Sequence, residues 1–132
     1  MAEAIVYPGG VMADGLPTAL VGPARLAAVH ATGLLDTGPE EAFDDLAQLA
    51  SVVTGCGRAF ITLVDGRRSF WKSCVGIDFG DAADPADPAN RQGPVRESFC
   101  YFIVGLEGQP FVVEDAVRDP RTREHPRWSR WR

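Results

Sequence analysis

The sequence has no hydrophobic run long enough to cross a membrane and no basic start typical of a secretory signal. Its densest apolar runs, residues 60–64 and 101–104, are far shorter than the roughly 18 to 20 residues that a membrane-spanning helix needs. The first basic residue is Arg25, whereas a secretory signal begins with a basic segment. These absences lead us to expect a cytoplasmic protein without a membrane partner.

Cysteine is scarce and is not arranged in pairs. Cys56, Cys74 and Cys100 are far apart in the chain and lie in apolar surroundings. This pattern indicates reduced thiols rather than a disulfide framework, and the lack of a Cys-x-x-Cys pair argues against a zinc site. The aspartates of residues 78–87 are interrupted by two prolines and lack the alternating spacing of a calcium loop, so we predict no metal ligand.

Positive charge is concentrated at one end of an otherwise acidic chain. The formal net charge is −5, although six arginines lie within residues 118–132. The acidic body repels nucleic acid, so only this end could attract it, with Trp128 and Trp131 available to stack on bases. The alternative is that the arginine stems pack on the body of the domain, and we favour it over a nucleic-acid partner.

The length and composition are those of one globular domain. The chain has 132 residues, of which 45% are hydrophobic and 23% are charged. Residues 1–21 mix glycine, proline and small residues without a period, so we expect a flexible leader that adds nothing to the core. The domain itself is expected over residues 22–132.

Two helices are predicted in the first half of the domain. The first begins at Pro23 and ends at Gly33, because proline suits the first turn of a helix and glycine its end. The second follows Thr37 and Glu40, which are expected to cap it, and ends at Gly55. Apolar residues at steps of three and four predict its buried face, which consists of Phe43, Leu46, Ala50 and Val53.

The rest of the domain is expected to supply a sheet and a third helix. Residues 59–64 and 69–76 predict two strands of an antiparallel hairpin. Residues 77–93 are polar and rich in aspartate, which predicts a long loop of the kind that forms binding lids. A helix from residue 94 or 95 to residue 104 and a strand over residues 111–113 complete an α+β domain, in which helices cover an antiparallel sheet.

Five segments, taken in this order, resemble the GAF domains of bacterial signalling proteins such as sensor histidine kinases, diguanylate cyclases and SpoIIE-like phosphatases. They are residues 25–41, 42–49, 60–76, 96–100 and 110–120. The resemblance implies a GAF-like antiparallel sheet flanked by helices, with a cavity for small molecules against the sheet. Complete members continue with central strands and a last helix, so the chain resembles a C-terminally truncated GAF domain.

The resemblance implies a sensory or regulatory module of a bacterial signal-transduction protein, such as a two-component system, with no catalysis of its own. Its partners would be an unidentified small-molecule ligand and a signalling output domain or partner protein, and the first helix of the family commonly forms homodimers. The sequence identifies no cofactor, and we assign no catalytic residue. The ligand-binding candidates are those expected to border the cavity, namely Phe70, Trp71, Lys72, Arg96, Ser98, Cys100 and Tyr101.

Cys100 leaves a second hypothesis open. A thiol near the start of a helix and beside Arg96 could act as a nucleophile or redox sensor, which would make the protein a cysteine-dependent redox enzyme on the same fold. The alternative is that Cys100 is a small apolar residue on a buried helical turn.

Overall fold

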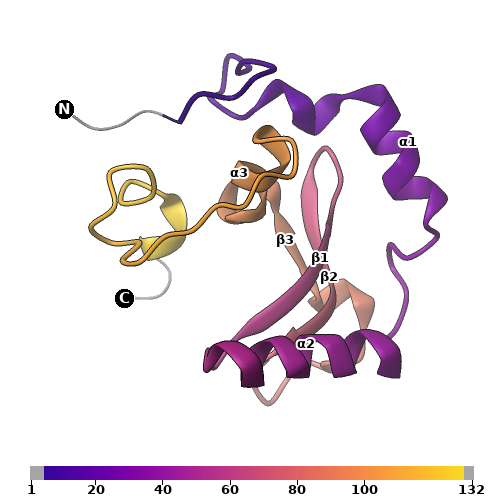
Figure 1. Ribbon diagram of the computed structural model, residues 1–132. Helices are drawn as coiled ribbons and strands as arrows, with labels where there is room; N and C mark the ends of the chain where they lie inside the picture. The colour runs from indigo at the N-terminus through magenta and orange to yellow at the C-terminus, as the bar shows by residue number, and fades with distance from the viewer. Residues whose placement is uncertain (1–4, 130–132) are drawn as a thin grey trace.

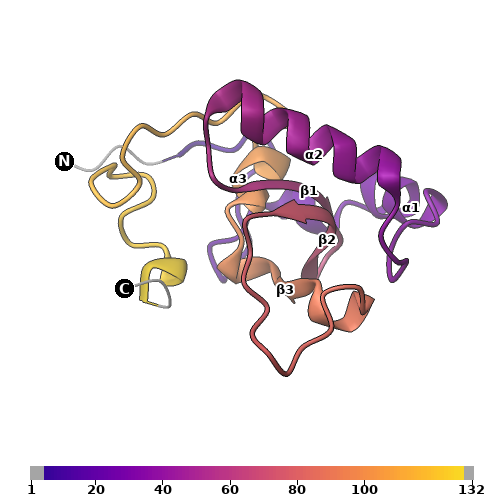
Figure 2. The same ribbon diagram turned by 90° about the horizontal axis from the view of Figure 1, so that it is seen from below.

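The computed structural model describes residues 5–129, with side chains described as far as residue 127. The chain folds as an α+β domain in which helices surround a three-stranded antiparallel sheet, so the predicted class is confirmed. Helix α2 (Glu41–Thr54) packs along the β1–β2 hairpin from one side, and α3 (Cys100–Gly105) contacts the hairpin away from α2 (Figure 1, Figure 2). No helix among residues 5–129 is long and apolar enough to span a membrane.

The sheet contains β1 (Ala59–Val64), β2 (Arg68–Val75) and β3 (Gln92–Pro94), in that order. The first two strands form the predicted hairpin, and its register shifts between Ile61 and Thr62. Ile61 lies opposite Ser73 and Thr62 lies opposite Trp71, which leaves Lys72 as the extra residue of a β-bulge.

Residues 77–93 are not one continuous loop, as the sequence predicted. They contain the 3-10 helix η2 (Pro88–Asn90) and most of β3, which pairs with β2 so that Gln92 lies opposite Phe70. So short a strand has no room for the hydrophobic alternation that identifies strands from sequence. The unpaired loop is therefore confined to residues 76–87.

The core includes part of the segment before residue 22, contrary to the prediction that this segment adds nothing to it. Leu20 is 0% exposed and clusters with Leu16, with Val64 of β1 and with Val95. Leu20 belongs to the 3-10 helix η1 (Thr18–Val21), whose few apolar residues form no period that a sequence search detects. The domain boundary at residue 22 stays a prediction.

Arg25, on α1 (Pro23–Ala31), joins η1 to the sheet. Its guanidinium donates hydrogen bonds to the carbonyl oxygens of Ala19 at 3.1 Å, Leu20 at 2.7 Å and Val64 at 2.5 Å. Partial burial lowers the pKa of Arg25, and the nearby charge of Asp65 opposes this effect. The charged group thus links two carbonyls of η1 to the last residue of β1.

Helix α2 ends at Gly55 as predicted, with a left-handed φ of 70°, but its start differs from the prediction. The residue before its first turn is Glu40, whose side chain makes no capping hydrogen bond. The Thr37 hydroxyl instead donates to the carbonyl of Leu34 at 2.6 Å and accepts from Lys72. The predicted cap is therefore wrong, because tertiary partners engage the threonine.

The buried face of α2 also differs from the prediction. Ala47 is buried against the sheet, and Asp44 accepts a hydrogen bond from the Ser73 hydroxyl at 2.6 Å. Leu46 and Val53, both predicted to face the core, are 57% and 75% exposed. The apolar residues do form one stripe, but α2 meets the sheet at the edge of that stripe, beside Asp44, where the small Ala47 side chain lets the backbone approach the strands.

The third helix is shorter than predicted. Residues 95–97 form the 3-10 helix η3 (Val95–Glu97), and α3 begins only at Cys100. The Ser98 hydroxyl accepts a hydrogen bond from the Cys100 backbone N–H at 3.0 Å. This local side-chain contact separates the two helical pieces, which the apolar spacing had joined into one helix.

Residues 111–113, predicted as a strand, form no strand in the described structure. Val112 is largely exposed, and its carbonyl accepts a hydrogen bond from Arg121 at 3.0 Å. The Arg121 guanidinium also lies 4.8 Å from the centre of the Phe111 ring. Figure 1 shows this C-terminal part, in light orange to yellow, on the side of the molecule away from α1. An arginine contact therefore holds the segment that the apolar pattern assigned to the sheet.

Candidate functional site

A groove lies on the face of the sheet away from α2. It consists of two adjoining hollows, of about 390 and 340 Å³, that share Trp71, Ser98 and Arg127. Volumes of this size suit small-molecule ligands. The other residues that line the two hollows are Ser69, Gln92, Gly93, Pro94, Glu97, Arg58, Phe60, Thr62, Phe99 and Cys100.

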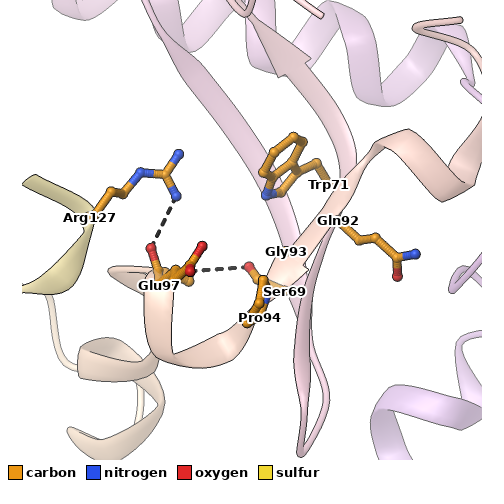
Figure 3. Close-up of a pocket in the computed structure, with 8 residues that line it drawn as sticks. Ser69, Trp71, Gln92, Gly93, Pro94, Glu97 and Arg127 are labelled. Atoms are coloured by element: carbon orange, nitrogen blue, oxygen red, sulfur yellow. Dashed lines mark hydrogen bonds between the residues drawn. The ribbon is translucent and has the colours of Figure 1, made fainter. Parts of the chain in front are cut away.

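The alternation of β2 brings Ser69 and Trp71 into this groove. Residues two apart on a strand point to the same face of a sheet, so both lie on the face away from Lys72. The Trp71 ring meets the edge of the Phe60 ring, with 5.7 Å between their centres, which holds the indole in place. Figure 3 shows Trp71 on one side of the groove and Arg127 on the other.

The floor of the groove is polar. The Ser98 hydroxyl donates a hydrogen bond to the Ser69 hydroxyl at 3.2 Å, and both serines are buried (Figure 3). Arg127, on the 3-10 helix η4 (Pro126–Ser129), donates from Nη1 to the carbonyl oxygen of Glu97 at 3.2 Å. The groove therefore combines an aromatic wall, buried hydroxyls and a guanidinium, which together can bind a small molecule that has a flat part and a polar part.

The structure brings three of the seven predicted ligand-binding residues together in this groove, namely Trp71, Ser98 and Cys100. Phe70 is fully buried and alternates with Trp71 along β2, so it lies on the opposite face. Arg96 and Tyr101 line a separate hollow near the N-terminal segment. Whether any of these residues binds a ligand stays a prediction.

Lys72 holds the connection between α1 and α2 rather than bordering the groove. Its buried ammonium donates to the Thr37 hydroxyl at 2.7 Å and to the carbonyl oxygen of Gly38 at 2.8 Å, and it forms an ion pair with Glu40. The ammonium also lies 5.4 Å from the centre of the Phe43 ring. These contacts satisfy the buried charge and fix the start of α2 on the sheet.

The arginine predicted to activate Cys100 is engaged elsewhere. Arg96 forms an ion pair with the Asp14 carboxylate at 3.1 Å and also donates to the Asp14 carbonyl. Cys100 is partly buried and lines the smaller hollow of the groove. The redox hypothesis for Cys100 stays untested.

Within residues 5–127, no group of three or more metal-ligating side chains is placed to hold an ion.

Sequence reasoning missed several residues of the groove, above all Ser69, Gln92 and Arg127. The alternation of β2 was sufficient to place Ser69 beside Trp71. Nothing local pointed to Gln92 or Arg127, because the first lies in an unpredicted strand and the second in the arginine-rich end of the chain. Both are recognised only when the segments that carry them are placed next to β2.

Several arginines of the C-terminal segment have acidic partners within the domain. Arg118 pairs with Asp115 at 3.6 Å, and Arg121 pairs with Asp119 at 2.6 Å. Hydrogen bonds from Arg121 lower the pKa of Asp119 to about 2. Both pairs lie within the segment and Arg118 is 88% exposed, whereas Arg127 reaches the body of the domain through its hydrogen bond to the Glu97 carbonyl. Arg130, Trp131 and Arg132 lie outside the described residues, and the question of a nucleic-acid partner stays a prediction.

His125 is buried beside the groove. Its ring stacks on Phe99 with 4.3 Å between ring centres, and its Nε2 lies 3.3 Å from the carbonyl oxygen of Ser98. Burial lowers the pKa of His125, and the charge of Arg127 lowers it further, whereas the Ser98 contact and Glu97 oppose this shift. The folded protein therefore holds this imidazole in its neutral form more strongly than the unfolded chain does.

A loss of stability on mild acidification is expected from His125. Since its folded pKa lies below the unfolded value of 6.5, the stability that the neutral ring contributes is complete above pH 6.5 and is lost as the pH falls from there through the lower folded pKa. We expect urea unfolding to give a lower free energy at about pH 5 than at about pH 7, and His125→Phe to reduce this difference.

The control for this measurement is His30→Gln, at an exposed position of α1, which should leave the pH dependence unchanged. Hydrogen bonds from Arg68 and Arg121 lower the pKa of Asp36 and Asp119, respectively. These carboxylates therefore stay ionised between about pH 5 and about pH 7 and do not cause the expected difference in stability. An equal pH dependence in His125→Phe and the wild type would contradict the assignment to His125.

No protein-family model matches the sequence. The chain is similar to the cyclic di-GMP phosphodiesterase PA2567 of Pseudomonas aeruginosa, with 32% identity over 102 residues. The match covers 77% of this chain and 15% of that protein, so the chain corresponds to a small part of its relative.

This match corrects one expectation from the sequence. The chain was expected not to be an enzyme, yet the similar protein is named as a phosphodiesterase, which is an enzyme. The expectation rested on the resemblance to GAF domains and on the lack of a catalytic motif in the sequence, and a shared fold does not by itself fix an activity.

Proposed function

We propose that this chain is a ligand-binding regulatory domain, of the GAF type, in a protein that takes part in cyclic di-GMP signalling. The groove beside Trp71 is the observation that carries the ligand-binding part of the proposal. The similarity to a cyclic di-GMP phosphodiesterase supports the signalling part. The five segments that resemble GAF domains, and the α+β fold, support the assignment of type.

The lining of the groove suits a small molecule with a planar ring system and a polar or anionic group. The Trp71 indole offers a flat surface on which a ring can stack. The Ser69 and Ser98 hydroxyls can rotate to donate to or accept from a ligand, and Arg127 adds positive charge. Purine nucleotides combine these features and are the first ligands to test.

The position of the groove also suits a regulatory role. Its walls come from β2 and from η4, which are far apart in the sequence, and η4 is joined to η3 by the hydrogen bond from Arg127 to the Glu97 carbonyl. A ligand that contacts both walls favours the conformations in which they lie together. On this proposal, ligand binding shifts that balance and the shift is passed to an attached output domain, or to a second copy of the chain.

Ligand binding should be seen first at the Trp71 indole. In protein labelled with ¹⁵N-tryptophan, we expect titration with purine nucleotides, including cyclic di-GMP, to shift the Trp71 indole N–H resonance in a saturable way. The Trp71→Phe variant assigns this resonance by its loss. Trp71→Ala should weaken binding by about 1–3 kcal/mol, which is the usual cost of removing an aromatic stacking partner.

The matched control is Leu49→Ala, on the exposed face of α2 and outside the groove, which should bind as the wild type does. If a nucleotide binds and Trp71→Ala binds it as tightly as the wild type, the groove is not the ligand site. If no nucleotide moves the Trp71 resonance more than the other indole resonances, the proposed ligand class is wrong.

A further inference from the structure

Arg91 is a buried cation that lacks a counter-charge in the part of the chain that the structure describes. The residue is 4% exposed. Its Nε and Nη1 atoms are buried and have no hydrogen-bond partner within residues 5–127. Its Nη2 atom meets the Cys74 sulfur at 3.7 Å, which is a weak acceptor. None of the ion pairs formed by the described residues includes Arg91.

This lack of partners is costly, because a guanidinium keeps its charge at any physiological pH. A buried charge is tolerated when it is paired and hydrogen-bonded, and it destabilises the fold when it is not. Lys72 of β2 is also a buried cation, and its ammonium has two hydrogen-bond acceptors and an ion pair. This contrast indicates that the counter-charge of Arg91 comes from a group other than the described side chains.

Arg91 lines a hollow of about 300 Å³, which lies between α2, the end of β2 and the loop of residues 76–87. The hollow shares no lining residue with the groove at Trp71, and its other polar walls are Asp44, Gln48 and Ser73. Arg91 therefore borders a hollow that is separate from the groove, and its Nε and Nη1 atoms are covered in this structure.

The charges around the hollow favour one kind of anion. Asp44 accepts the Ser73 hydroxyl and is not paired with Arg91. Asp81, Asp84 and Asp87 of the same segment do not line the hollow but add negative charge to the chain next to it. A singly charged carboxylate neutralises Arg91 through charge-assisted hydrogen bonds, whereas a doubly charged phosphate meets more repulsion from these carboxylates.

We propose that Arg91 anchors the carboxylate of a small, singly charged ligand in this hollow. The site is separate from the groove, and it gives the loop between β2 and β3 a role in binding, because residues of this loop form one wall. The carboxylate supplies both the missing counter-charge and acceptors for the N–H groups of Arg91.

The test uses acetate as the probe. The Nε–H resonance of Arg91, assigned by its loss in Arg91→Lys, is followed while sodium acetate, sodium phosphate or sodium chloride is added at constant ionic strength and pH. We expect acetate to cause a saturable shift, phosphate to bind more weakly and chloride to cause none. The Trp71 indole resonance should not move with acetate.

Two variants complete the test. In the wild type, acetate that binds the folded protein should raise the Tm. Arg91→Met removes the charge and keeps an apolar side chain of similar length, so this rise should be lost. Acetate should also bind at least about tenfold more weakly, which corresponds to about 1.4 kcal/mol. Arg96→Met is the matched control, because Arg96 pairs with Asp14 outside this hollow, and it should keep the acetate response.

Three results would overturn the proposal. The first is a shift of the Arg91 resonance that does not saturate with acetate or is equal with chloride, a result that needs only the wild-type protein. The second is an unchanged acetate response in Arg91→Met. The third is tighter binding of phosphate than of acetate, which would contradict the choice of a singly charged ligand. If Arg91→Met does not fold, the wild-type titration decides the question.

Discussion

Replacing Phe70 with alanine is expected to lower the free energy of unfolding by about 3–5 kcal/mol, the usual cost of truncating a buried aromatic residue. Phe70 is 0% exposed and lies in the central strand, opposite Leu63 on β1 and Gln92 on β3. Removing its ring leaves a cavity at the point where the three strands meet, because the paired backbones prevent the site from collapsing. Urea denaturation followed by circular dichroism measures the loss.

Two further variants separate a core role of Phe70 from a ligand-binding role. Phe70→Leu preserves most of the apolar volume and should cost less than about 1.5 kcal/mol. Trp71→Ala, at the neighbouring half-buried position, should affect nucleotide binding more than it affects stability. A Phe70→Ala protein that is as stable as the wild type but loses binding would place Phe70 in the ligand site, as the sequence predicted.

Replacing Leu20 with alanine is expected to cost about 2–5 kcal/mol of unfolding free energy, the range found for buried leucines. Leu20 is fully buried in the cluster with Leu16, Val64 and Val95, so its loss opens a cavity between η1 and the sheet. The stability of a domain of this size is only about 5–15 kcal/mol, so the effect should be visible as a large fall in the urea midpoint.

The neighbouring Val21 supplies the control for this prediction. It is 45% exposed, and Val21→Ala should change the unfolding free energy by less than about 0.5 kcal/mol, as surface substitutions usually do. If Leu20→Ala is equally neutral, residues 1–21 are the leader that the sequence predicted, and the packing of η1 on the sheet contributes nothing to stability.

Much of the secondary structure could be predicted because its signals are local. Pro23 and Gly55 mark a helix start and a helix end by their backbone preferences, and the structure has α1 and α2 at these positions. The β1–β2 hairpin follows from two strand-forming runs separated by a short turn. Each of these signals lies within a few residues of the feature that it predicts.

The errors share one physical cause, which is that distant partners decided the outcome. Helix α2 has one apolar stripe, yet its contact with the sheet lies at the edge of that stripe, at Ala47, and leaves Leu46 and Val53 exposed. Thr37 was expected to cap this helix, yet the Lys72 ammonium binds its hydroxyl. In both cases a long-range contact overrode the local preference.

The candidate site was predicted only in part, because its residues come from segments that are far apart in the sequence. Trp71 and Ser98 were both named from the sequence, and they meet because η3, which Ser98 follows, packs against β2. Arg127 completes the groove from a segment more than fifty residues beyond Trp71 along the chain. A single sequence does not predict that Trp71 and Arg127 lie close together, because neither residue affects the local backbone structure of the other.

The sequence by itself determined the α+β class, the hairpin and the approximate course of α1 and α2, because backbone preferences and apolar alternation act over a few residues. Only the tertiary structure decided which face of α2 is buried, that Leu20 belongs to the core and that two guanidinium nitrogens of Arg91 are buried without a hydrogen-bond partner among the described residues. These outcomes depend on burial and charge pairing between segments far apart in the chain, and burial is a property of the packed molecule.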